Sequence, residues 1–250
     1  MNNPARAGAA AHAMVADVAG ATIALSDATH RHFLRVLRLR AGEAVTVTDG
    51  RGSWRPTAVP GTFSTHACLE PTGDITILER PAIKISFGIA LPKGDKPEFV
   101  VQKLTELGVD EILFFHGDRS VAHWNEEKVR RNIERLRAVA VEALQQSRGA
   151  FMPTVGWIPD LAAHIGGVDT ATAVPGAQRV FRTDVTGVSL ALGASQLFLV
   201  GPEGGWSPRE TELGEAVGLG DLILRAETAA VVGAALAVSL RSGLVCPGGR

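Results

Sequence analysis

The chain has 250 residues, 46% of them hydrophobic, which is enough to bury one large core or two smaller ones. Its 25 basic and 26 acidic side chains give a net charge of −1, which excludes a strongly basic nucleic-acid-binding protein, so a nucleic acid could bind only to a local basic patch. Cys68 and Cys246 stand far apart with no Cys or His at ligand spacing, which argues against a disulfide framework or a bound metal.

The first part of the chain predicts a small β-rich domain, which we place at residues 1–79. Between residues 14 and 78, short alternating segments such as EAVTVTDG and GDITILE are separated by Gly, Pro, Asp and Asn, a pattern typical of a barrel-like unit. The residues before it carry no clean apolar run, because His12 and Asp17 interrupt it. We therefore expect a cytoplasmic chain rather than a secreted one.

Within this domain, residues 30–40 (HRHFLRVLRLR) form a basic segment with no acidic side chain. On a helix with about 3.6 residues per turn, three arginines would share one narrow sector and three apolar side chains would point the other way. The arginines are Arg31, Arg35 and Arg38, and the apolar residues are Phe33, Val36 and Leu37. Such a ridge of like charges favours an anionic partner such as a phosphate backbone, with ion pairs to acids elsewhere in the fold as the alternative.

After residue 80, apolar strand candidates alternate with helical stretches, which predicts an α/β domain at 80–250 with a mostly parallel sheet covered on both faces. The strand candidates are AIKISFGIAL, VDEILFFHG, AQRVFRTD, SQLFLVG and GDLILR. One helix is expected to begin at Asp95, with Glu98 completing a capping box, and to end at Gly108. A second helix is expected from an Asn125 cap to Gly149.

The stretch LFLVGPEGGWSPRE, residues 197–210, ends an apolar strand in a glycine loop. It lacks the lysine of a Walker loop and does not match G-x-G-x-x-G, and Glu203 would repel a polyphosphate. The three glycines, Gly201, Gly204 and Gly205, allow the main chain to approach a ligand closely. A cationic ligand or a neutral base therefore fits better, at the carboxyl end of a parallel strand where open sheets bind ligands. A plain tight turn is the alternative.

A helix start follows the glycine loop, with Ser207 as N-cap, Pro208 in the first turn and Glu210 at the third helical position. We expect this capped helix to hold the loop in place.

The second loop, LILRAETAA at residues 222–230, repeats this logic. A strand at 222–224 is followed by Arg225, Glu227 and Thr228 and then by an apolar helix. Charged groups between buried elements are costly unless they pair or meet a ligand, so we expect a ligand site, with a structural ion pair as the alternative. The apolar run at 229–240 is shorter than the roughly 18 residues of a membrane span and predicts a buried helix.

These two loops, in this order near the C-terminus, resemble the signature of the RsmE family of 16S ribosomal RNA uridine-N3 methyltransferases, in the SPOUT (trefoil-knot) superfamily. Residues 30–50 resemble the family's His-x-x-x-Val-Leu-Arg-x-x-x-Gly segment, 91–109 its Lys-x-x-x-x-Glu-x-x-x-x-Lys-x-x-Glu-Leu-Gly-Val helix, and 142–153 its Glu-Gln-Ser-x-Arg…Pro stretch. The resemblance covers about residues 23–244. The chain departs from the family at Ala226, where threonine is usual, and around Arg119, where only Arg-Ser of a longer motif remains.

The resemblance implies a PUA-like β-barrel that helps to hold RNA, followed by a knotted α/β domain that binds S-adenosylmethionine. It also implies a homodimer with the site near the subunit interface, acting on 16S ribosomal RNA or the small ribosomal subunit, with no membrane and no metal. The residues expected to hold the cofactor are Leu199, Val200, Gly201, Pro202, Glu203, Gly204, Gly205, Gly220, Leu222, Ile223, Leu224, Arg225, Thr228 and Ala229.

For the chemistry, Arg225 is expected to stabilise the uracil anion, while Glu203 or Glu227 accepts the N3 proton or orients the cofactor's ammonium group. Lys103 on the apolar stripe of its helix either snorkels or reaches a phosphate. The residues expected to contact RNA are His30, Arg31, Arg35, Arg38, Lys93, Lys103, Arg119 and Arg148. The alternatives are another SPOUT methyltransferase, acting on a ribose 2′-hydroxyl or another base, and a non-catalytic RNA-binding protein. The missing G-x-G-x-x-G argues against a Rossmann-type enzyme.

Overall fold

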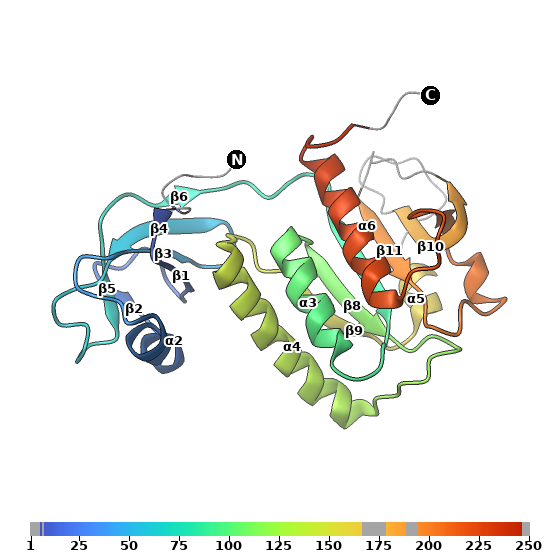
Figure 1. Ribbon diagram of the computed structural model, residues 1–250, viewed down its shortest axis with the longest axis horizontal. Helices are drawn as coiled ribbons and strands as arrows, with labels where there is room; N and C mark the ends of the chain where they lie inside the picture. Colours follow the sequence, from blue (N-terminus) through green and yellow to red (C-terminus); the bar gives the residue numbers. More distant parts are fainter. Residues whose placement is uncertain (1–5, 7, 167–178, 189–194, 247–250) are drawn as a thin grey trace. The chain divides into compact units, whose positions relative to one another are not determined.

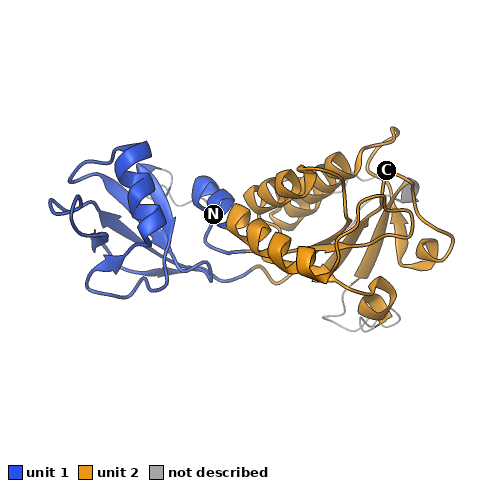
Figure 2. Ribbon diagram, turned by 90° about the horizontal axis from the view of Figure 1, so that it is seen from below, with its two compact units in different colours: residues 1–80, 141–152 blue, residues 81–140, 153–250 orange. Residues whose placement is uncertain are grey.

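The chain divides into two compact units (Figure 1, Figure 2). The computed structural model describes residues 6, 8–166, 179–188 and 195–246. Unit 1 comprises the described residues of 1–80 and 141–152, and unit 2 comprises those of 81–140 and 153–250. One change of unit therefore falls at residues 80–81, and a later segment of the chain returns to unit 1.

Unit 1 is built on a six-stranded sheet in the order β1-β3-β4-β5-β2, with β6 paired to β4. The strands are β1 (Ala11–Met14), β2 (Ile23–Ala24), β3 (Ala44–Thr48), β4 (Ser53–Ala58), β5 (Cys68–Pro71) and β6 (Thr76–Ile77). The β1–β3 pair is parallel and the remaining pairs are antiparallel. Fully buried Val45, Val47 and Leu69 belong to its apolar core, which Phe33 also joins.

Buried His12 ties the segment after residue 141 to this sheet. Its Nε2 donates to the carbonyl oxygen of Gly149 (3.0 Å), so in the neutral ring Nδ1 accepts from the Thr46 hydroxyl (2.8 Å). Desolvation by burial, partly offset by the Gly149 hydrogen bond, lowers the pKa of His12 to about 4. The ring is therefore neutral at pH 7, and its two nitrogens can make both hydrogen bonds, one as donor and one as acceptor.

The basic segment does not form the continuous helix predicted for residues 30–40. The helix α2 (Asp27–His32) passes into a π-helical turn, η1 (Phe33–Leu37), and Arg38 ends it with a left-handed φ of 54°. A π turn bonds residue i to i+5, so the 3.6-residue projection fails here. Val36 and Leu37, predicted to face the core, are 65% and 43% exposed.

The sheet of unit 2 has the order β12-β10-β11-β7-β8-β9, and all its pairs are parallel, as predicted. Its strands are β7 (Ile85–Ala90), β8 (Glu111–Phe115), β9 (Thr154–Ile158), β10 (Arg179–Val188), β11 (Gln196–Val200) and β12 (Glu215–Val217). The chain builds outward from β7 through β8 to β9 and then fills the other side, so the strand order reverses between β7 and β11. Such a switch point is where open parallel sheets bind ligands.

Helices cover both faces of this sheet. They are α3 (Lys96–Leu107), α4 (Glu126–Ser147), α5 (Leu161–Gly166) and α6 (Ala226–Arg241). On one face α3 and α6 lie side by side (Figure 1), and Gly233 of α6 packs so closely that a Cβ there would lie 3.3 Å from the Phe87 ring. On the other face Leu161 and Ile165 of α5 join a core with Leu197 and Leu199.

The helix termini agree only in part with the predicted caps. Gly108 ends α3 with a φ of 84°, and the Asn125 side chain accepts from Lys128 N (2.9 Å) at the start of α4. The capping box predicted at α3 is wrong, because the Asp95 side chain makes no cap hydrogen bond and Glu98 pairs with Arg135 of α4 (2.9 Å).

The strand predicted at residues 222–224 is also wrong. These residues form a loop in which Leu222 is 77% and Ile223 90% exposed, and the edge strand is the earlier β12. The helix predicted after it is present as α6 and buries a row of small residues including Ala230, Ala234 and Ala237. Among the described residues, no helix combines the length and apolarity needed to cross a membrane.

Candidate functional site

Two loops at the carboxyl edge of the unit 2 sheet enclose a cavity of about 580 Å³. One follows β11, as predicted, and the other leads from β12 into α6, whereas the sequence predicts a strand at 222–224 before it. The predicted cofactor residues that line the cavity are Val200, Gly201, Pro202, Glu203, Gly205, Gly220, Leu222, Ile223, Leu224, Arg225 and Ala229. The other three lie outside its lining: Leu199 is fully buried in the sheet, and Gly204 and Thr228 are exposed.

The cavity also contains residues that the sequence did not single out as ligand-binding. These are Thr183, Asp184, Trp206, Thr211, Leu219 and Ala226, and Arg119, expected to contact RNA, lines it as well. Thr183 and Asp184 come from β10, which pairs with β11, so the sheet itself brings them to the cavity. Trp206 directly follows the glycine loop, and this position in GPEGGW could have identified it from the sequence as a residue of the ligand site.

Each glycine of the loop has its own steric reason. A Cβ on Gly201 would lie 2.8 Å from the Trp206 ring, and one on Gly204 would lie 3.0 Å from Arg119. Gly205 has a φ of +72°, a conformation that other residues rarely adopt. Trp206 is fixed in turn, because its Nε1 donates to the carbonyl oxygen of Thr183 (3.0 Å). The loop is therefore shaped by close packing as well as by backbone freedom.

The capping box after the loop forms, but the predicted helix does not. Ser207 N donates to Glu210 Oε2 (2.8 Å) and Glu210 N donates to Ser207 Oγ (3.3 Å), as a capping box requires. Only the 3-10 helix η2 (Glu210–Glu212) follows. Gly214, with a φ of 91°, turns the chain beside the Val180 carbonyl oxygen, where a Cβ would lie only 2.6 Å away, and β12 begins.

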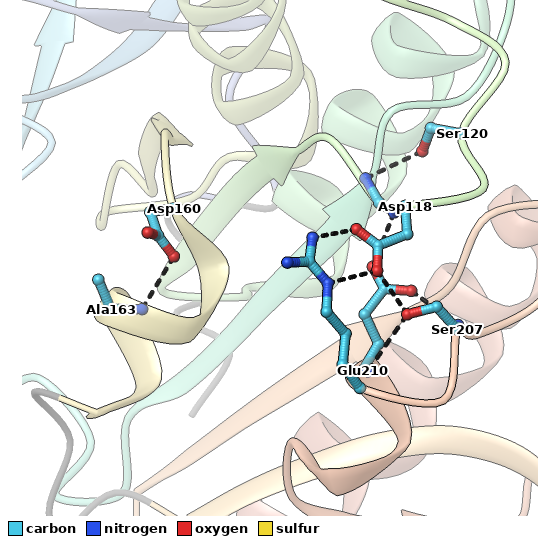
Figure 3. Close-up of polar contacts among 8 residues, drawn as sticks. Asp118, Ser120, Asp160, Ala163, Ser207 and Glu210 are labelled. Atoms are coloured by element: carbon cyan, nitrogen blue, oxygen red, sulfur yellow. Dashed lines mark hydrogen bonds and ion pairs between the residues drawn. The ribbon is translucent and has the colours of Figure 1, made fainter.

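An ionic network replaces that helix as the support of the loop (Figure 3). Asp118, after β8, accepts from Ser207 Oγ (2.5 Å) and Arg209 Nε (2.5 Å), and its own N–H donates to Glu210 Oε1 (2.9 Å). The hydrogen bond from Arg209, followed by that from Ser207, lowers the pKa of Asp118 to about 2. Asp118 is thus ionised at neutral pH and joins the loop after β8 to the loop after β11.

The two predicted catalytic carboxylates meet around one ammonium group. Lys96 Nζ at the start of α3 lies 3.6 Å from Glu203 Oε1 and 3.3 Å from Glu227 Oε1. Glu203 lines the cavity, whereas Glu227 is only 15% exposed and does not belong to the cavity lining. Glu227 Oε2 is buried with no hydrogen-bond partner among the residues that the structure describes. Sequence analysis missed Lys96, because only the fold brings α3 to these loops.

Arg225 stands at the edge of this group. It is the exposed N-cap of α6, its carbonyl oxygen accepts from Ala229 N (2.8 Å), and the residue lines the cavity. Across the described residues there is no group of three or more His, Cys, Asp or Glu side chains that could hold a metal ion. The cavity therefore offers main-chain groups, carboxylates and two guanidinium groups to a ligand.

The residues expected to contact RNA fall into two groups. Three make contacts within the fold: Arg148 donates to the Ala9 carbonyl oxygen (2.6 Å) and to that of Arg6, His30 Nε2 donates to the Phe63 carbonyl oxygen (2.6 Å), and Lys103 pairs with Glu106 (2.9 Å). The other five are exposed, and Arg119 among them also donates to the Gly204 carbonyl oxygen (3.4 Å); they are Arg31, Arg35, Arg38, Lys93 and Arg119.

The chain is similar to known RNA methyltransferases along most of its length. Residues 79–238 match the family model of the RNA methyltransferase domain, and residues 25–59 match that of the RNA methyltransferase PUA domain. The ribosomal RNA small subunit methyltransferase E of Mycobacterium bovis is 31% identical over 212 residues, 80% of each chain. That of Synechocystis is 32% identical over 228 residues, which cover 85% of this chain and 71% of the relative.

A solved structure gives the same result. The ribosomal RNA small subunit methyltransferase E from Neisseria gonorrhoeae, crystallised bound to S-adenosyl methionine, superposes with a TM-score of 0.76 at 26% identity and covers 92% of this chain and 97% of its own. The mixed α/β fold with a parallel sheet and an N-terminal PUA-type domain is thereby confirmed.

Proposed function

Because the chain belongs to the family of ribosomal RNA small subunit methyltransferases E, we propose that its loop cavity binds S-adenosylmethionine and that it methylates N3 of a uridine near the 3′ end of 16S ribosomal RNA. The observation that carries the proposal is the cavity of about 580 Å³ formed by the two signature loops. Because its proposed substrate is the small ribosomal subunit, we infer that the protein acts in the cytoplasm.

The cavity suits this cofactor in size and charge. Its volume lies within the range of about 300–1,000 Å³ that is usual for small-molecule sites. The carboxylate of Asp184 in its lining complements a cationic group such as a sulfonium or an ammonium. When bound, S-adenosylmethionine supplies an activated methyl group, so the protein's task is alignment and proton removal.

Arg225 and Glu203 are the side chains that we assign to the uracil. Uracil N3 must lose its proton, and the exposed guanidinium of Arg225 stabilises the anion that results. Glu203 accepts the proton, because Glu203 lines the cavity whereas Glu227 does not. Glu227 acts through Lys96, which pairs with both carboxylates (3.6 Å to Glu203 Oε1 and 3.3 Å to Glu227 Oε1).

This assignment has a direct test in two matched variants. Glu203→Gln keeps the shape of the side chain, so it should bind S-adenosylmethionine as the wild type does but lose most of its methyl transfer. Glu227→Gln should retain more activity, because it removes only the second carboxylate beside Lys96. Loss of cofactor binding in Glu203→Gln would instead assign Glu203 to the cofactor's ammonium group.

We further propose that two copies form a homodimer with the cavity near their interface. The support is the loop that carries Leu222 and Ile223, apolar side chains that are 77% and 90% exposed in a single chain although they line the cavity. Apolar surface of this kind favours a protein partner. Light scattering should report a dimer for the wild type and a monomer for Ile223→Asp.

The decisive experiment is calorimetric titration with S-adenosylmethionine, followed by methyl transfer to small ribosomal subunits from cells that lack the activity. Wild-type binding, with the label mapped to N3 of a 16S uridine, is the expected result, and Arg225→Ala should bind the cofactor but transfer slowly. Label on a ribose 2′-oxygen or another base would assign a different methyltransferase reaction. No cofactor binding by the wild type would leave a non-catalytic RNA-binding protein.

A further inference from the structure

A cluster of four aromatic side chains lies at the carboxyl ends of β8 and β9, outside the cavity. The rings of His116 and His123 stack at 4.1 Å between centroids with an interplanar angle of 17°. His116 also meets the edge of Trp157 (4.6 Å), and Trp157 lies 5.8 Å from Trp124. We call these four residues the aromatic cluster. Trp157 belongs to β9, and the other three lie in the loop after β8.

The loop that carries the cluster is fixed rather than loose. The main-chain N–H of Trp124 donates to His116 Nε2 (3.0 Å), which joins the start of the loop to its end. Burial and the neighbouring His123 lower the pKa of His116, so its ring is neutral at pH 7 and can accept this bond. The cluster therefore has a set geometry without a ligand, which is the property of a preformed binding surface.

The cluster remains open to solvent. His123 is exposed, its neighbour Val121 is 67% exposed, and Trp124 and Trp157 are only half-buried. If the rings served only to pack the loop, the His123 ring and the Val121 side chain would be expected to lie inward. Flat aromatic faces open to solvent are the usual platform for unpaired bases.

The aromatic cluster and the cavity lie at the same edge of the sheet. In the parallel pairing Phe114 of β8 is opposite Trp157 of β9, and β11 ends in the glycine loop at this edge as well. The loop after β8 also touches the glycine loop, because Gly117 lies against Pro202 and Arg119 against Gly204. Arg119, exposed and lining the cavity, lies on the same loop as His116 and His123 and supplies a positive charge for a phosphate.

We propose that the aromatic cluster is a second RNA contact, on which an unpaired base next to the target nucleotide stacks, chiefly on the exposed ring of His123. The inference rests on the proposed function, since it assumes an RNA substrate at the cavity. The stacked base holds the strand beside the cavity while the neighbouring nucleotide enters it. Stacking depends on a flat ring rather than on a charge, so it adds affinity without reading the identity of the base.

The test is the affinity for small ribosomal subunits that lack the methyl group, measured at pH 8 for three His123 variants. His123→Ala should weaken binding by about tenfold, the usual cost of losing one base stack. His123→Phe should bind within about twofold of the wild type, and His123→Gln should weaken binding as the alanine variant does. The matched control is His164→Ala, which removes an exposed imidazole from α5.

The salt dependence separates stacking from charge. A lost stack removes no phosphate contact, so the slope of log K against log salt should be the same for His123→Ala and wild type. Unchanged affinity in His123→Ala, or equal loss in His123→Phe and His123→Ala, would overturn the inference.

Methyl transfer and cofactor titration on the same wild-type protein keep the two proposals apart. If the wild type methylates its substrate and His123→Ala binds small ribosomal subunits with unchanged affinity, only the proposed stacking surface would be refuted. A wild type without cofactor binding would sink the proposed enzyme, while the His123 series would still report on RNA contact.

Discussion

Adding a single methyl group at Gly201 should damage the cofactor site more than any other small change in the loop. A Cβ there would lie 2.8 Å from the Trp206 ring, against the 3.4–4 Å of ordinary contacts, so the indole must shift by more than half an ångström. The ring cannot move freely, because Nε1 donates to the Thr183 carbonyl oxygen (3.0 Å) and its face stacks with Phe115 (6.5 Å between centroids).

The expected magnitude follows from these two contacts. Overpacking at a fixed ring costs about 1–3 kcal/mol, and a weakened hydrogen bond adds about 1 kcal/mol. Trp206 lines the cavity, so part of this cost appears in ligand binding: the Kd of Gly201→Ala for S-adenosylmethionine should rise by about 10- to 100-fold. The remainder should appear as a Tm lower by a few degrees.

Calorimetric titration and a thermal melt of the same sample measure both effects. The matched control is Gly166→Ala in unit 2, where an added Cβ would meet nothing within 4 Å. If Gly201→Ala bound the cofactor with wild-type affinity and melted at the wild-type temperature, the packing explanation for this glycine would be wrong.

Three further predictions concern stability. Burial lowers the pKa of His12 to about 4, so the folded state binds a proton at this ring less readily than the unfolded state does. The contribution of neutral His12 to the free energy of unfolding is full above about pH 6.5 and should be lost as the pH falls toward 4, a decrease of at most about 3 kcal/mol. Urea unfolding of wild type against His12→Gln across that range measures it, and identical pH profiles would refute it. Arg241→Ala should lower the free energy of unfolding by about 3–5 kcal/mol, because it removes the cationic partner of the buried Asp110 carboxylate, which also accepts from Ile85 N (2.9 Å), and a loss below about 1 kcal/mol in urea unfolding would contradict this. Gly214→Ala, at a φ of 91° and with a Cβ 2.6 Å from the Val180 carbonyl oxygen, should lower Tm by several degrees, whereas a Tm equal to wild type would show that the turn adapts.

The amino-acid sequence predicts the architecture where apolar segments repeat. Strands such as 85–90 and 196–200 are apolar on both faces because helices cover both sides of the sheet, and that pattern is visible without coordinates. The parallel α/β fold was predicted correctly from this pattern, whereas the family and its PUA-type domain were predicted correctly from the resemblance of the signature motifs. The run at 222–224 looks the same in sequence, yet it is an exposed loop, because hydrophobicity does not tell a core strand from apolar residues that face solvent.

After the glycine loop, the local signal predicted the hydrogen bonds correctly but the secondary-structure element wrongly. Ser207 and Glu210 form the capping box that their spacing predicts, but the chain cannot continue as a helix where Gly214 must pass beside Val180. Lys96 could not be assigned at all, because its role depends on two carboxylates more than one hundred positions further along the chain. Local sequence signals therefore do not predict which distant loops come into contact.

The glycine loop is consequently held by contacts with the loop after β8 rather than by a helix that follows it in the chain. With only the three residues of η2 after it, the loop is held by Asp118 and Glu210, whose hydrogen bonds join it to the loop after β8. That second loop also carries Arg119, which lines the cavity, and His116, which belongs to the aromatic cluster. The bonds that orient the cofactor loop therefore orient the RNA surface that we propose. Any coupling between cofactor and RNA binding in unit 2 has its physical route through residues 116–120, because that segment touches both surfaces.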